Sequence, residues 1–103
     1  MEETALLDHA QLLEKCKVGL GKENADEAII NQIDLVLGTV EGYMLDGGVI
    51  PEVLYNPLRA GVVVMGVNDL WNLAPGEVKF SSAFTRMLIQ MVMKSQTIKG
   101  AAS

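Results

Sequence analysis

The sequence predicts an all-α domain, and its central segment carries that prediction. Residues 56–73, NPLRAGVVVMGVNDLWNL, begin like a helix and are apolar on every side through their first half. Asn56 is a good N-cap, and Pro57 fits the first helical position, where the missing N–H costs nothing. Residues 60–67 include no polar side chain, so the whole circumference of this helix must be covered. The prediction is a single domain of about four helices around a central apolar helix. This helix is covered either by the rest of the fold alone or in part by another subunit.

The central segment also supplies candidate residues for the core and for a subunit interface. They are Val62, Val63, Val67, Leu70 and Trp71. A buried β-strand is the alternative for residues 62–64, because β-branched runs fit a sheet interior. No second strand-like run is available for pairing, which favours the helix. The apolar run is also far shorter than the roughly 18 residues of a membrane span.

Two helices are expected before the central segment. The first is predicted over residues 4–20 and ends at Gly19 and Gly21. The second follows the polar loop KENAD, with Asn24 as its cap, and runs to about residue 45. Its apolar residues repeat at alternating four- and three-residue steps, which is the strongest periodic signal in the chain: Ile29, Ile33, Val36, Val40 and Tyr43.

Gly38 and Gly42 lie one turn apart inside the second predicted helix. Each costs about 1 kcal/mol relative to alanine in a helix interior, so a compensating feature is expected. One explanation is the close approach of another backbone, which makes both glycines candidates for a subunit interface. The other is a locally frayed or bent helix.

The last helix begins at Ser81 or Ser82 as N-cap and carries Phe84, Leu88 and Met91 on one side. No linker or repeat divides the chain. We therefore expect one domain over residues 1–95, with residues 1–10 as a candidate extension. Residues 96–103 are small and polar and are expected to form a flexible tail.

Composition excludes some functions. The net charge of −5 and a pI near 4.7 argue against a protein that grips phosphate backbones. The single cysteine, Cys16, cannot form an internal disulfide, and Glu2 and Glu3 replace the positive start of a signal peptide. These features indicate a protein made and kept in a reducing cytosol.

No catalytic constellation is visible in the sequence. His9 has neither HExxH-type spacing nor a cysteine pair, so a metal site has no ligand set. The glycines lack the pattern of a phosphate-binding loop, and Ser81 and Ser82 are better explained as a helix cap than as nucleophiles. His9 and Cys16 are expected to be structural. The chain is interpreted as a non-enzyme without catalytic residues, metal or cofactor.

Four segments together resemble the small head–tail connector, or adaptor, proteins of tailed bacteriophages and prophages. They are LLEKCKVGLG before the polar loop, DEAIINQIDLVLGTVEGYM, AGVVVMGVNDLWN and SSAFTRMLIQM, and they span roughly residues 12–91. The chain departs from such proteins in its extra N-terminal polar stretch and in Gly38, where a small Ala is more common.

The resemblance implies a structural DNA-packaging component of the virion, made in the host cytoplasm. Copies would form a dodecameric-type homo-oligomeric ring below the portal protein, bridging it to the head-closure or stopper protein. DNA would pass through the ring without tight or specific binding, and no membrane is involved. The alternative is a small dimeric helical regulator or chaperone-like module that presents an apolar groove to a partner.

Glu27, Asp34 and Glu41 recur every seven residues and are expected to form one acidic stripe on the second helix. An ordinary solvated face explains the stripe, because a buried apolar side demands a polar one. In a ring, the same carboxylates would form a lumen-facing band that repels DNA phosphates.

Overall fold

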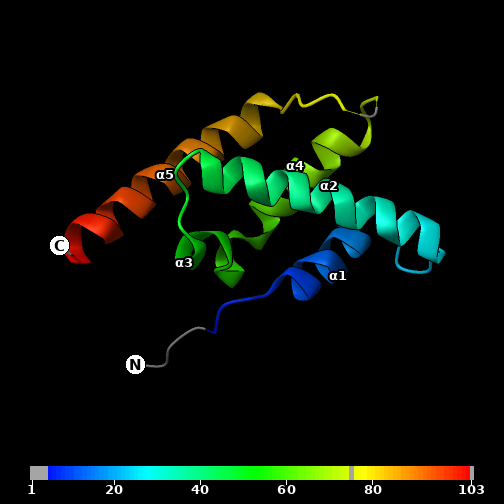
Figure 1. Cartoon of the computed structure of the whole chain (residues 1–103), viewed down its shortest axis with the longest axis horizontal. Helices are drawn as coiled ribbons and strands as arrows, with labels where there is room; N and C mark the ends of the chain where they lie inside the picture. Colours follow the sequence, from blue (N-terminus) through cyan, green and yellow to red (C-terminus); the bar gives the residue numbers. More distant parts are fainter. Residues whose placement is uncertain (1–4, 75, 103) are drawn as a thin grey trace.

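The computed structural model describes residues 5–74 and 76–102, and within them the chain is helical, with no strand (Figure 1). The elements are α1 (His9–Gly19), α2 (Glu27–Asp46), α3 (Pro51–Leu54), a 3-10 turn η1 (Pro57–Arg59), α4 (Ala60–Trp71) and α5 (Ser82–Ala102). The all-α prediction is confirmed, and the strand alternative for residues 62–64 is wrong because these residues lie in α4. The short α3 is not among the helices predicted from the sequence.

α4 packs against α1, α2 and α5. In Figure 1, α2 crosses α4, α1 lies near one end of this crossed pair, and α5 lies near the other end. α3 lies against α2 and α5. In the described part of the chain, no helix is long and apolar enough to cross a bilayer.

α1 begins later than predicted, at His9, because Asp8 caps it. The Asp8 carboxylate accepts from the Gln11 backbone N–H at 2.8 Å, and the Gln11 side chain accepts from the Asp8 N–H at 2.9 Å. This reciprocal capping box fixes the helix start and leaves residues 5–8 outside the helix. Residues 1–4, with the predicted start at Thr4, lie outside the described residues.

α2 is capped by Asp26, not by the predicted Asn24. The Asp26 carboxylate accepts from the Ile29 N–H at 3.0 Å. Asn24 lies within the preceding turn, where the Ala25 N–H donates to Lys22 O at 3.1 Å. Asn24 therefore precedes the N-cap position of α2. α2 ends at Asp46, and Gly48 then adopts a φ of +109°, which favours glycine.

The predicted cap at Asn56 is present, but it caps η1, which leads directly into α4. The Asn56 side chain accepts from the Leu58 N–H at 2.9 Å, with Pro57 in the first turn. Ser81 caps α5, because its Oγ accepts from the Phe84 N–H at 3.2 Å. Asp69 at the end of α4 in turn accepts from the Ser81 N–H and hydroxyl, at 2.9 and 2.7 Å.

α5 continues through Ala102, so residues 96–102 of the predicted tail are helical. Ile98 is half-buried and packs against the core cluster, which extends the contact of α5 beyond the expected end at residue 95. Ser103 lies outside the described residues.

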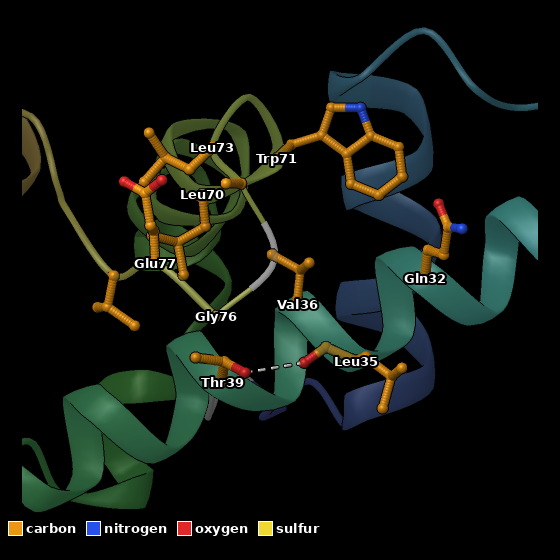
Figure 2. A pocket seen from close by; sticks show the side chains of 11 residues that line it. Gln32, Leu35, Val36, Thr39, Leu70, Trp71, Leu73, Gly76 and Glu77 are labelled. Atoms are coloured by element: carbon orange, nitrogen blue, oxygen red, sulfur yellow. Dashed lines mark hydrogen bonds between the residues drawn. The ribbon is translucent and has the colours of Figure 1, made fainter.

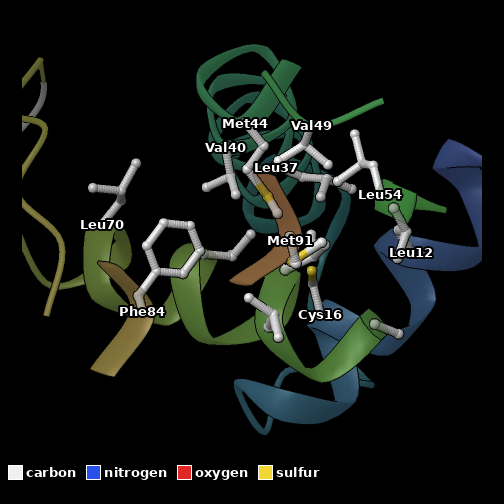
Figure 3. Close-up of a cluster of buried hydrophobic side chains, with 14 of the residues drawn as sticks. Leu12, Cys16, Leu37, Val40, Met44, Val49, Leu54, Leu70, Phe84 and Met91 are labelled. Atoms are coloured by element: carbon white, nitrogen blue, oxygen red, sulfur yellow. The ribbon is translucent and has the colours of Figure 1, made fainter. Parts of the chain in front are cut away.

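One apolar core joins all the helices (Figure 3). Its α4 members include four of the candidate residues, while Trp71 is half-buried at the edge: Val62, Val63, Val67 and Leu70. α5 closes the core with Phe84 and Met91, both fully buried. Gly66 allows this approach, because an added Cβ would lie 2.5 Å from Cε1 of Phe84.

Ser95 ties α5 to α3. Its hydroxyl donates to Met91 O at 2.8 Å and accepts from the Ile50 N–H at 3.0 Å. α3 has no capping side chain of its own at Ile50, so α5 supplies the missing acceptor.

Candidate functional site

Two features of α2 are candidates for function, and they lie on different flanks of the helix. The first is a polar cluster of His9, Asp34, Glu41 and Tyr55, on the flank that faces α1. The second is an apolar groove between α2 and the end of α4 with its following loop.

In the polar cluster, His9 bridges two carboxylates of α2. Its Nδ1 lies 2.5 Å from Glu41 Oε1, and its Nε2 pairs with Asp34 Oδ1. Both ring nitrogens therefore face acceptor oxygens, and only the imidazolium form can donate to both. The other Glu41 oxygen accepts from the Tyr55 hydroxyl at 2.8 Å.

The electrostatics agree with a charged His9. Its hydrogen bond to Asp34 raises the pKa of His9 above 6.5; partial burial opposes this shift, and Glu41 adds to it. Glu41 is only 6% exposed, so its carboxylate depends on His9 and Tyr55 for the interactions that water would otherwise supply. The cluster thus fastens α1 and the segment after α3 onto α2.

The Tyr55 hydroxyl and the Cys16 thiol, which lie near Glu41, both hold their protons strongly. Burial, with a contribution from Glu41, raises the pKa of Tyr55 to about 12 and that of Cys16 to about 11. Cys16 is fully buried, so its thiol stays protonated at neutral pH and is a poor nucleophile. Among the described residues, no group of three or more His, Cys, Asp or Glu side chains is arranged to hold a metal ion.

The prediction of one exposed acidic stripe is wrong at Glu41. Glu27 is exposed, Asp34 is half-buried, and Glu41 is buried against α1. Seven residues are slightly less than two full turns, so a heptad series drifts by about 20° per repeat around a straight helix. Along α2 this drift carries the carboxylates progressively toward α1, where His9 meets the last two.

The apolar groove, which we call the α2 groove, has a volume of about 520 Å³. Residues of α2 form one side, and the end of α4 with the loop that follows forms the other (Figure 2). The lining consists of Gln32, Leu35, Val36, Thr39, Leu70, Trp71, Leu73, Ala74, Gly76, Glu77 and Val78. Figure 2 shows Leu70, Leu73 and Glu77 across the groove from α2.

The α2 groove is open to solvent although most of its lining is apolar. Leu35 is 72% exposed and Val78 is 51% exposed. The hydroxyl of Thr39 donates to Leu35 O at 3.1 Å within the helix, so it has a partner without any ligand. Glu77 is the carboxylate of the groove lining.

Gly38 and Gly42 lie inside an uninterrupted α2. An added Cβ at either glycine would meet nothing within 4 Å, so no backbone of the same chain approaches them. The helix also does not fray at this point. The two glycines therefore leave a shallow, open surface on α2.

Sequence reasoning missed both the pairing of His9 and the groove. Spacing placed Asp34 and Glu41 on one side of a helix, but His9 lies 25 and 32 residues away from them in the chain. The one available signal for the groove was Leu35, an apolar residue outside the periodic stripe of α2.

The fold and the site define a small all-helical domain with an open apolar groove. Comparison of the chain with protein-family models, with curated proteins and with solved structures finds no match.

Proposed function

We propose that this chain is a structural head–tail connector of a tailed bacteriophage or prophage, and not an enzyme. In this proposal, copies with α4 as their central helix form a ring below the portal protein and bridge it to the head-closure or stopper component. Support comes from the resemblance of four segments over residues 12–91 and from a single all-helical domain.

The observation that carries the proposal is the open α2 groove. An open apolar groove on a folded domain is a typical surface for binding another protein or a ligand. Here Leu35 and Val78 remain largely exposed beside a core that is otherwise closed by Phe84 and Met91. An adaptor needs such a surface in every copy.

The polar groups support a structural role. His9, Glu41 and Tyr55 hydrogen-bond to one another and link α1 and the end of α3 to α2. Burial keeps Cys16 protonated. A reactive centre would instead direct such groups toward a cavity where substrate can lie. The net charge of −5 favours a DNA passage that does not retain the duplex.

Co-sedimentation with portal rings from the same genome tests the proposal. We expect the chain to sediment with portal rings and to form a closed ring on them that is visible by electron cryomicroscopy. Heads that lack the portal serve as the control and should bind none. A protein that ignores portal rings and instead remains a dimer that binds an amphipathic helix in the α2 groove would favour the regulator or chaperone-like module.

A further inference from the structure

We infer that the α2 groove of one copy receives the outward face of α5 from a second copy of this chain. The inference deepens the proposed function, on which its link to a ring rests, by naming the two surfaces that meet.

The outward face of α5 is apolar where a surface helix is usually polar. Ile89 and Met93 lie one turn apart and are 55% and 60% exposed. The inward side of α5 already packs in the core through Phe84 and Met91. We call the outward set the α5 ridge: Arg86, Ile89, Gln90 and Met93.

Charge complementarity selects a second copy as the occupant. The charged residues of α5 are all basic, namely Arg86, Lys94 and Lys99. The charged residue of the groove lining is acidic, Glu77. A basic helix is therefore attracted to the groove, whereas an acidic helix would be repelled.

The pair that would form this contact is Glu77 of one copy and Arg86 of the other. Glu77 lines the α2 groove, and Arg86 lies one turn before Ile89 on the α5 ridge. Both side chains are exposed, and neither makes an ion pair within the described part of the chain. Each would find an opposite charge when Ile89 and Met93 enter the groove.

The size of the groove also suits the apolar side chains of an incoming helix. The groove volume of about 520 Å³ is within the range of sites that enclose several apolar groups.

Each copy offers one groove and one ridge, and in a ring it would contact one neighbour through its groove and another through its ridge. Such head-to-tail contacts repeat into a closed ring or an open filament. A symmetric dimer would instead pair groove with ridge twice between the same two copies and would leave no free surface for a third copy.

Cross-linking distinguishes these arrangements. Thr39→Cys places a thiol in the groove and Gln90→Cys places one on the ridge; both positions are exposed. A short bis-maleimide reagent traps weak contacts at high protein concentration and on portal rings. The native Cys16 is a silent background, because it is fully buried with its pKa raised to about 11.

We expect the double cysteine variant to form a ladder of oligomers. Each single variant should stay monomeric, and a mixture of the two single variants should give only dimers. Dimers formed by a single variant alone, or a double variant that remains monomeric in both conditions, would overturn the inference.

A charge exchange tests the pairing of Glu77 with Arg86. In the double cysteine background, Glu77→Arg or Arg86→Glu alone should lower the ladder yield about two- to fivefold, and the two together should restore it. Glu52→Arg makes the same charge change at an exposed site on α3 and should leave the yield unchanged. Equal yields in all these variants would contradict the pairing.

The outcomes separate this inference from the proposed function. A ladder that forms without any binding to portal rings would retain the groove–ridge contact and reject the connector role. Rings that form on portals without a cross-link between positions 39 and 90 would retain the connector role and reject the contact.

Discussion

The two flanks of α2 differ in how fully their side chains are satisfied within one chain. On the flank toward α1, the buried carboxylate of Glu41 has both His9 and Tyr55 as partners. On the outward flank, Leu35 is 72% exposed and lies over an open groove. The polar residue is thus inside and the apolar residue outside, which inverts the usual arrangement. Burial on this helix therefore depends on which partner side chains the chain itself supplies. The outward flank is the surface to which we propose that a second protein binds.

The largest contrast is expected when an aspartate replaces a buried residue of the core in one variant and an exposed residue of the groove in another. Val63→Asp should unfold the domain, because an unpaired buried charge costs several kcal/mol against a total stability of about 5–15 kcal/mol. Leu35→Asp should leave the isolated chain folded, since its side chain is exposed. Thermal melting by circular dichroism measures both; a Val63→Asp variant that melts cooperatively would show that the core is misassigned.

Glycine substitutions sharpen the contrast between a packed and an open position. Gly66→Ala should cost about 1–3 kcal/mol, because the new Cβ would lie 2.5 Å from Phe84 and 3.0 Å from Val40. Gly38→Ala should stabilise the isolated chain by up to about 1 kcal/mol through its higher helix propensity. Urea unfolding of both variants checks the signs, and a neutral Gly66→Ala would mean that α5 does not close on α4 as described.

The polar cluster should be sensitive to the loss of one buried acceptor. Glu41→Gln replaces the charged partner of His9 and is expected to cost about 1–3 kcal/mol. Glu77→Gln is the matched control in an exposed loop and should change stability by less than about 0.5 kcal/mol. Similar unfolding free energies for the two variants would contradict a structural role for the cluster.

The smallest effect concerns pH. Folding raises the pKa of His9, so its imidazolium stabilises the fold fully below the unfolded value of 6.5. That stabilisation is lost as the pH rises through the higher folded value, and solvent screening keeps it below about 1 kcal/mol. The groups that face His9 are Asp34 and Glu41, with Tyr55 held on Glu41. Urea titrations at pH 6 and pH 8.5 should show a decline that a His9→Gln variant lacks.

Local signals in the sequence predicted much of the fold. Asn56, Pro57 and Ser81 mark real helix starts, because capping depends on hydrogen bonds within a few residues. The apolar repeat of α2 identified its buried side at Ile33 and Val40, whereas its last member, Tyr43, is 46% exposed. The cap at Asp26 was missed because the loop offers two residues that can cap, and turn bonds within the loop decide between them.

Long-range partners could not be predicted in the same way. Heptad spacing groups Asp34 with Glu41, but it does not say that α1 will bring His9 against them. The close fit of Gly66 against Phe84 likewise depends on how α5 returns across α4. The α2 groove likewise depends on a long-range contact, because it forms only where the loop after α4 lies beside α2.

The position of Phe84 and Met91 in the chain has a consequence for synthesis. Both belong to the last helix yet fill the centre of the core, and Ser95 completes the first turn of α3 from 45 residues away. A ribosome-bound chain that ends before α5 therefore leaves Val63 and Val67 uncovered, since chains emerge N-terminus first at about 5–20 residues per second. We expect folding to complete only after α5 has left the ribosome, and chains cut short before Phe84 to be prone to aggregation.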